Sequence, residues 1–344
     1  MGVRVSTSSL AGAVANCGAA GTIASVGLPP DTEENRRDVP KSCREHLQIE
    51  IRKSREISPE GVIGVNIMVA LSNYEDMVRT AAKEDVDFII SGAGLPLSLP
   101  EFAEGSRVKL IPMVSSGRGT KVLLQAWKRR YNRLPEALIV EGPLSGGHIG
   151  GHSLEDLKKG AFVTLETSFA DVLGVAREYG DIPVVAAGGI YDGSDIAKFF
   201  RLGARGVQMG TRFVATYECS AAKEFKDVYL KARKEDVIFI QSPVGMPAKA
   251  VKTKFTEDIT AGRRKDFHCS YQCLRTCDPG KVPFCIAKAL INAVEGDVDN
   301  GVVFAGSNVS RVKEIVHVKE LVDTLVAEAE EAMSVALGEK AGTI

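Results

Sequence analysis

The 344-residue sequence predicts an α/β protein, a (β/α)8 TIM barrel that lacks its first strand and carries a smaller helical cap domain. Three observations lead to this prediction. From residue 60 onward, short β-branched runs alternate with amphipathic helical stretches, as in proteins built from repeated βα units. Two consecutive strands end in glycine-rich turns, which is where barrels commonly bind phosphate. The alternation then breaks between residues 218 and 300, which indicates a separate, smaller unit.

Seven segments have the pattern of strands, and four segments between them have the spacing of helices. Strands are expected at residues 21–25, 62–67, 87–91, 108–114, 137–141, 183–187 and 206–209, and helices at residues 74–83, 121–130, 169–179 and 194–202. A closed barrel of this type needs eight strands. An open doubly wound sheet is disfavoured, because no GxGxxG follows a strand near the start of the chain.

The first residues read like a βα loop that runs into a helix after the polar run from Ser6 to Ser9. We therefore expect Met1 to correspond to an internal position of a barrel, whose first strand was lost by truncation or by a misassigned start codon. The alternative is a true variant without that strand.

Two domains are expected from the break in the pattern. Residues 1–215 and 311–344 form the barrel domain, and residues 216–310 form a helical cap over its C-terminal mouth, where loops build the active sites of barrels. Residues 312–336 have apolar side chains at helical spacing among many Glu and Lys. This pattern predicts an exposed amphipathic helix, which can supply the last helix of the barrel.

The composition limits the partners. With 43 Lys and Arg against 44 Asp and Glu, the net charge is −1, so no long-range field favours nucleic acid or an anionic membrane. No stretch approaches the roughly 20 apolar residues that span a bilayer. The N-terminal apolar run is too weak for a signal peptide, so a cytoplasmic protein is expected. The oligomeric state stays open, with a homodimer as one option.

Two glycine-rich strand ends, VVAAGGIYDG at 184–193 and GARGVQMGTRF at 203–213, are the strongest chemical signal. Backbone N–H groups at such ends bind phosphate, and glycine lets the phosphate approach without a Cβ in the way. The order of strands places both ends after strands seven and eight, where barrels commonly bind phosphate. Tight turns without a ligand are the alternative.

A third glycine-rich segment, VEGPLSGGHIGGHS at 140–153, carries two histidines. An imidazole on such a loop can act as acid, base or hydrogen-bond donor near neutral pH. We expect this role for His148, and a structural role for His152.

Four of the seven cysteines lie close together in the sequence, and they do not match a known metal motif. Their spacing differs from that of paired CxxC zinc sites and of ferredoxins. Packing on one face of a helix is favoured over a metal or cluster and over redox-active thiols. The four residues are Cys269, Cys273, Cys277 and Cys285.

The motifs STSSLAGAVANCG, GVNIMVA, SGAGLP, EGPLSGGHIG, PVVAAGGI, GVQMGTRF and VVFAGSN together resemble the nitronate monooxygenases, formerly called 2-nitropropane dioxygenases. The resemblance covers nearly the whole chain in order. It implies an FMN-binding barrel without a metal, which begins with a strand followed by QGGMG, and Met1 and Gly2 look like the end of that element.

The resemblance also implies roles for individual residues. His148 would be the catalytic residue, Asn66 would contact the isoalloxazine ring, Met1 and Gly2 would line the ring, and Glu141 is a weaker cofactor contact. The FMN phosphate would be held by Gly188, Gly189, Gln208, Met209, Gly210 and Thr211. Where the family usually has Glu-Ala-Gly-Gly-His, this chain has Pro-Leu-Ser-Gly-Gly-His, which changes the polar lining of the loop.

The expected reaction is the FMN-dependent oxidation of an alkyl nitronate by O2 to a carbonyl compound and nitrite. The main alternative is a sister family with the same barrel, the flavin-dependent enoyl-acyl-carrier-protein reductases, which reduce an enoyl thioester with NAD(P)H. A non-catalytic flavin- or phosphate-binding protein is a third interpretation, because of the missing strand. The sequence leaves the physiological substrate open.

Overall fold

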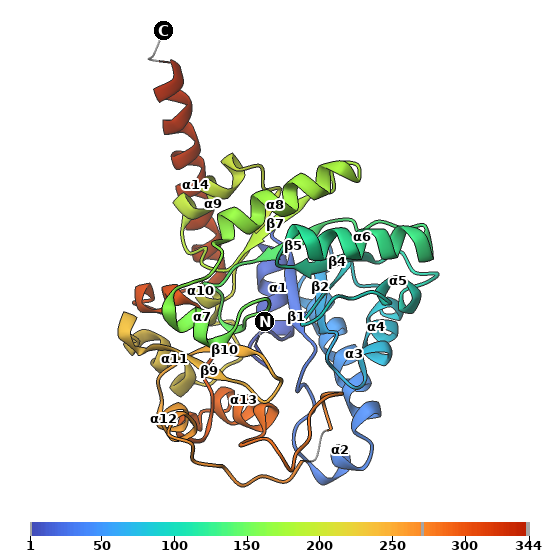
Figure 1. Ribbon diagram of the computed structural model, residues 1–344, viewed down its shortest axis with the longest axis vertical. Coiled ribbons are helices and arrows are strands. Elements are labelled where there is room, and N and C mark those ends of the chain that lie inside the picture. The colour runs from blue at the N-terminus through green and yellow to red at the C-terminus, as the bar shows by residue number, and fades with distance from the viewer. Residues whose placement is uncertain (1, 270–271, 342–344) are drawn as a thin grey trace.

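The computed structural model describes residues 2–269 and 272–341, and its centre is a curled sheet of seven parallel strands in chain order (Figure 1). All seven predicted strands are confirmed, each to within one residue at either end. They are β1 (Gly21–Ala24), β2 (Ile63–Met68), β3 (Phe88–Gly92), β4 (Lys109–Val114), β5 (Leu138–Glu141), β7 (Val184–Ala187) and β8 (Gly206–Gln208). Their β-branched side chains fill the core, and Ile63, Val65, Ile67 and Ile89 are fully buried.

The sheet is a TIM-like half-barrel that stays open on one side. Strands β8 and β1 are its two edges, and no pairing joins them in the described part of the chain. The expectation of seven strands is therefore confirmed. The space between these two edges contains a cavity, which is lined by residues from both of them.

Helices cover the outer face of the sheet, and the four predicted helices are confirmed as α4 (Tyr74–Lys83), α6 (Gly117–Tyr131), α8 (Leu165–Glu178) and α9 (Gly193–Arg201). The other helices in residues 1–215 are α1 (Ser8–Asn16), α2 (Glu33–Arg37), α3 (Val39–Ile57), α5 (Leu99–Phe102), α7 (Leu154–Lys159) and α10 (Thr211–Val214). Sequence reasoning missed α3, although its buried Leu47, Ile51 and Ser54 follow helical spacing.

The segment expected to be a helical cap contains a small antiparallel sheet as well, so the expectation of only helices and loops is wrong. Strands β9 (Val237–Gln241) and β10 (Pro247–Val251) pair with each other, and β10 also pairs with β6 (Gly147–His148). The run VIFIQ of β9 has the β-branched content of a strand. The helices of the segment expected as the cap are α11 (Lys223–Lys231), η1 (Lys234–Asp236), α12 (Lys254–Thr260), α13 (Ile286–Val294), η2 (Val298–Asn300) and, at its end, η3 (Ser307–Arg311).

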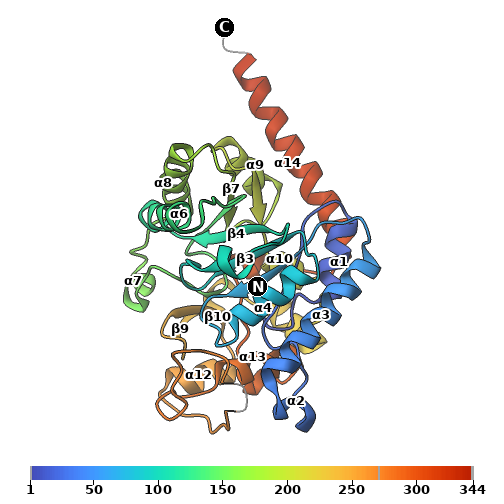
Figure 2. The same ribbon diagram turned by 90° about the vertical axis from the view of Figure 1, so that its right-hand side faces the viewer.

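The last helix, α14 (Val318–Ala341), begins six residues later than the sequence pattern predicts. Val316 instead forms a bridge with Thr216, which keeps the preceding residues extended. Buried Leu321 and Leu325 hold the first half of the helix against the body, and the far end projects away from it (Figures 1 and 2). No helix within the described residues is long and apolar enough to cross a membrane.

Candidate active site

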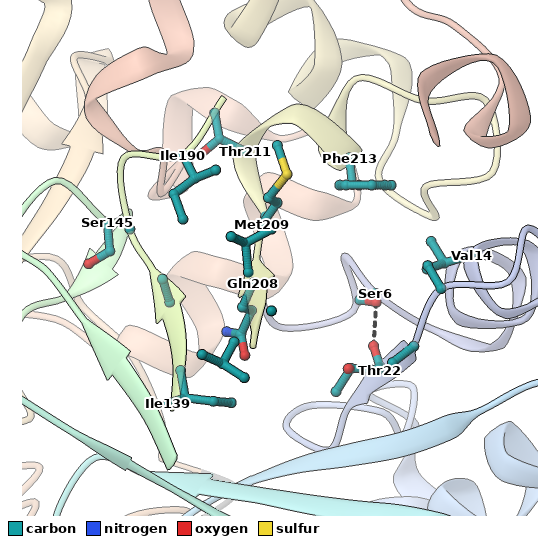
Figure 3. A pocket seen from close by; sticks show the side chains of 18 of the residues that line it. Ser6, Val14, Thr22, Ile139, Ser145, Ile190, Gln208, Met209, Thr211 and Phe213 are labelled. Atoms are coloured by element: carbon teal, nitrogen blue, oxygen red, sulfur yellow. Dashed lines mark hydrogen bonds between the residues drawn. The ribbon is translucent and has the colours of Figure 1, made fainter. Parts of the chain in front are cut away.

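A cavity of about 1100 Å³ occupies the open side of the half-barrel. Figure 3 shows Gln208 and Met209 at the end of β8 on one side, and Ser6 and Thr22 on the other, where the Ser6 hydroxyl donates to the Thr22 carbonyl. Ligand pockets usually measure about 300–1,000 Å³, so this cavity is large enough for a nucleotide-sized cofactor and a substrate.

The turn after β7 needs glycine at two consecutive positions. Gly188 and Gly189 have φ angles of +91° and +88°, a region that disfavours other residues. A Cβ on Gly188 would lie 2.9 Å from the Gly142 carbonyl oxygen, and one on Gly189 would lie 2.8 Å from the Leu144 Cβ. The turn after β7 therefore packs directly against the loop after β5, and both line the cavity.

The turn after β8 differs, because Gly210 faces open space. Nothing lies within 4 Å of a Cβ built on Gly210, and its φ of −131° is accessible to any residue. Gly210 and Thr211 both line the cavity. Glycine here is thus not required by the protein's own packing, which leaves room for a ligand to approach the backbone.

Two buried polar atoms in the cavity wall have no hydrogen-bond partner within the described residues, the Gln208 side-chain carbonyl oxygen and the Ser145 hydroxyl. Buried polar atoms are nearly always paired, so each unpaired one calls for an explanation. A polar ligand in the cavity supplies one. The cavity size, the open space at Gly210 and these two atoms fit a flavin nucleotide.

One segment, residues 304–308, ties three loops of the site together. The Gly306 N–H donates to the Thr211 hydroxyl at 3.0 Å, and the Ser307 N–H donates to the Leu144 carbonyl at 3.0 Å. The Asn308 amide donates to the Gly189 carbonyl at 2.7 Å. The loops after β5, β7 and β8 are therefore held in one arrangement by a single distant segment, a role that sequence reasoning did not assign to it.

His148 lies on the two-residue strand β6, next to Gly147 of the cavity wall. Its Nε2 lies 2.7 Å from the Ser242 hydroxyl, and its ring packs edge-on against Phe304 with centroids 5.1 Å apart. Gly147 and Phe304 line the cavity, while the imidazole stands beside the wall. Burial lowers the pKa of His148 to about 4, so the ring is neutral at pH 7.

A family comparison matches this arrangement to known proteins. The family model described as nitronate monooxygenase matches residues 1–328. The chain belongs to the nitronate monooxygenase family. This match confirms the resemblance seen in the sequence.

The relatives of this family member are chemically diverse. It is 27% identical over 255 residues to (3aS,4S,5R,7aS)-5-hydroxy-7a-methyl-1-oxo-octahydro-1H-indene-4-carboxyl-CoA dehydrogenase of Mycobacterium tuberculosis, covering 74% of this chain and 62% of that protein. It is 29% identical over 127 residues to a probable nitronate monooxygenase of Staphylococcus aureus, covering 36% and 34% of the two chains. The chain thus spans less than two thirds of the length of these curated relatives.

Solved structures similar to this one support the fold. FabK from Thermotoga maritima superposes with a TM-score of 0.74 and 28% identity, over 97% of this chain and 92% of that one. A nitroalkane oxidase from Streptomyces ansochromogenes superposes with a TM-score of 0.75 and 22% identity, over 98% and 95% of the two chains. At 22% identity, the similarity to the nitroalkane oxidase supports the fold alone.

Most of the site residues expected from the sequence lie together, and a few do not. The cavity wall contains Gly2, Glu141, Gly188, Gly189, Gln208, Met209, Gly210 and Thr211. Asn66 is at the expected strand, but its amide points to the Met113 sulfur at 4.0 Å and is not part of the wall. Met1 lies outside the described residues. His152 packs edge-on against Phe162, in keeping with a structural role.

The burial of Glu141 at the end of β5 leads us to expect that the stability of the protein depends on pH. Burial raises the pKa of its carboxyl to about 7 from an unfolded value of 4.5, so the folded protein favours the protonated form. This contribution to stability is fully present below pH 4.5 and is lost as the pH rises through 7. Thermal denaturation of wild type and Glu141→Gln between pH 5 and 8 checks this expectation. As the pH rises, the Tm of the wild type should fall more steeply than the Tm of the variant. Parallel Tm curves would contradict it.

The four clustered cysteines do not form a helix, so that part of the expectation is wrong. Each of the four lies outside the helices in the described residues, and Pro279, Gly280 and Pro283 disfavour a helix between Cys277 and Cys285. Cys273 and Cys277 pack against the barrel core, and burial raises the pKa of Cys273 to about 12. Among the residues that the structure describes, no group of three or more His, Cys, Asp or Glu is arranged to hold a metal ion. These contacts agree with packing.

Proposed function

We propose that this chain uses FMN and O2 to oxidise alkyl nitronates to a carbonyl compound and nitrite. The observation that carries the proposal is His148, a neutral imidazole beside the cavity wall, with the Ser242 hydroxyl at hydrogen-bond distance and Phe304 packed against its ring. A nitronate is the anion of a nitroalkane, so a neutral base nearby can bind it or remove a carbon proton from the neutral form.

FMN would supply the electron transfer and the oxygen chemistry, and the protein would hold and orient it. Gly188, Gly189, Gly210 and Thr211 would hold the phosphate with backbone N–H groups and one hydroxyl. Gly2 and Glu141 also line the cavity, and the ring would extend toward them. The unpaired Gln208 oxygen and Ser145 hydroxyl would find partners on the cofactor or the substrate.

The proposed two-domain division places the reacting group between the parts. His148 belongs to the barrel loop after β5, whereas its partner Ser242 belongs to the proposed cap, residues 216–310. Pairing of β6 with β10 fixes this loop against the cap. The departure at Pro143, Leu144 and Ser145 puts a serine into the cavity wall three residues before the histidine, which would bear on substrate choice.

A second candidate is reduction of an enoyl thioester with NAD(P)H. Two comparisons favour it: 28% identity with FabK over 97% of this chain, and the similarity to a dehydrogenase of a CoA thioester. The third interpretation, a non-catalytic flavin-binding protein, is favoured only by the open side of the half-barrel.

One experiment separates the three. The purified protein is scanned for flavin absorbance, then given propionate 3-nitronate under air while nitrite release is followed, and separately given NAD(P)H with a crotonyl thioester. Nitrite release supports the proposal. A yellow protein that releases no nitrite but oxidises NAD(P)H with the thioester moves it to the reductases, and a flavin-bound protein inert in both assays supports the non-catalytic alternative.

A further inference from the structure

Lys249 on β10 is among the largest fully buried side chains, with 1% exposure. Its ammonium donates to the Pro143 carbonyl at 2.7 Å and to the Ser307 hydroxyl at 2.6 Å, and it lies 5.1 Å from the centre of the Phe239 ring. Within the described residues it forms no ion pair. Burial of a charge without a counter-charge is costly, so an ammonium held here by neutral groups needs a reason.

The two acceptors explain what Lys249 connects. Pro143 begins the turn, residues 143–146, that leads directly into Gly147 and His148. Ser307 belongs to the segment 304–308 that also binds Thr211 and Gly189. One buried cation therefore links the turn that carries the histidine to the segment that holds the glycine-rich loops.

The sheet pairing adds a second link to the same loop. Lys249 lies opposite Gly147, and the preceding Ala248 lies opposite His148. The backbone of β10 thus fixes the end of the turn while the side chain of Lys249 fixes its beginning. Both ends of the residue 143–148 segment are held by one residue and its neighbour.

We infer that Lys249 is a positioning residue, whose ammonium holds the turn at residues 143–146, and with it His148, in place relative to the loops proposed to bind the flavin phosphate. This inference rests on the proposed function, because it takes His148 as the reacting group. A shift of about 1 Å in a reacting group can cost roughly 10²-fold in rate, so a small loosening of this turn is enough to matter.

The test compares the holoenzymes of Lys249→Met and Lys226→Met. Lys226 is the matched control, since it is also a buried lysine, 8% exposed, and its ammonium donates to the Thr216 carbonyl at 2.8 Å, away from the turn. Methionine follows the path of either side chain as far as Cε and removes only the ammonium, so it keeps most of the buried apolar packing. We expect Lys249→Met to lower kcat by roughly 10–100-fold with little change in KM, and Lys226→Met to leave kcat unchanged.

A double-mutant cycle with His148→Asn separates positioning from general damage. If Lys249 acts through His148, adding Lys249→Met to His148→Asn costs little further activity, because the group being positioned is already gone. If the double variant is slower by the full factor of Lys249→Met, the inference is overturned.

Amide hydrogen exchange provides a readout that does not depend on activity. Lys249→Met should speed exchange in residues 143–148 and 304–308 and leave the rest of the barrel unchanged. Equal exchange in wild type and variant overturns the inference even when the wild type turns over. Absence of turnover in the wild type counts against the proposed function, while the exchange data still decide whether Lys249 holds the turn.

Discussion

Replacement of His148 by asparagine is expected to lower kcat/KM by about 10²–10⁴-fold, the range typical for loss of a general acid or base, while the flavin stays bound. Asparagine is neutral and occupies the inner half of the imidazole site, but its amide does not extend to the position of Nε2, which lies 2.7 Å from the Ser242 hydroxyl in the wild type. It cannot take up a proton at neutral pH. Steady-state kinetics with the nitronate, alongside the visible spectrum of each protein, measure both halves of this result.

His152→Asn is the matched control, because His152 lies on the same glycine-rich stretch but packs against Phe162. It should retain activity. Full activity in His148→Asn would defeat the assignment, and so would an equal loss in both variants. The pH profile adds a check: since the pKa of His148 is lowered to about 4, wild-type kcat/KM should lose the contribution of the neutral imidazole only as the pH falls toward 4.

The parallel sheet could be predicted from sequence because each strand has a recognisable pattern of apolar residues within its own segment. Val184–Ala187 is a short apolar run that stops at Gly188 and Gly189, and the same pattern recurs around Gly206–Gln208. Their order along the chain then places both turns at the carboxyl edge of a parallel sheet. Local pattern and topology together were therefore sufficient to bring Gly189 and Gly210 to one cavity.

Contacts made by distant residues could not be predicted in this way. Ser242 lies 94 residues from His148, and Asn308 lies 119 residues from Gly189. Neither residue lies in a local pattern that identifies its partner, because each contact forms only when distant segments meet in the folded chain. Lys249 is a further case, since a single lysine in the strand PAKAV gives no sign of complete burial.

Asn66 shows that a correctly predicted strand does not establish the contacts of a side chain on it. It lies within β2, as expected, but successive side chains of a strand point to opposite faces, so knowing the strand does not establish what one side chain contacts. Here its amide approaches the Met113 sulfur. The motif GVNIM therefore located the strand without establishing the contact, and the role of Asn66 toward a flavin remains a proposal.

Replacement of Gly210 by valine is expected to weaken flavin binding by roughly 10–100-fold, equivalent to one or two lost charge-assisted hydrogen bonds, with little change in Tm. The position permits a side chain: nothing lies within 4 Å of its Cβ and its φ is −131°. The added methyl groups would occupy the open space in the cavity wall where the phosphate is proposed to approach the backbone. Flavin absorbance per protein and a titration of flavin into the stripped protein measure the loss.

Gly174→Val is the matched control, because Gly174 also has nothing within 4 Å of its Cβ but lies on the exposed face of α8. Its flavin content should equal that of the wild type. Normal flavin binding by Gly210→Val would show that the phosphate does not lie at the turn after β8, whatever the enzyme's substrate. Since this readout needs no turnover, it tests the cofactor site separately from His148, and the two substitutions together distinguish a protein that cannot hold flavin from one that holds it without reacting.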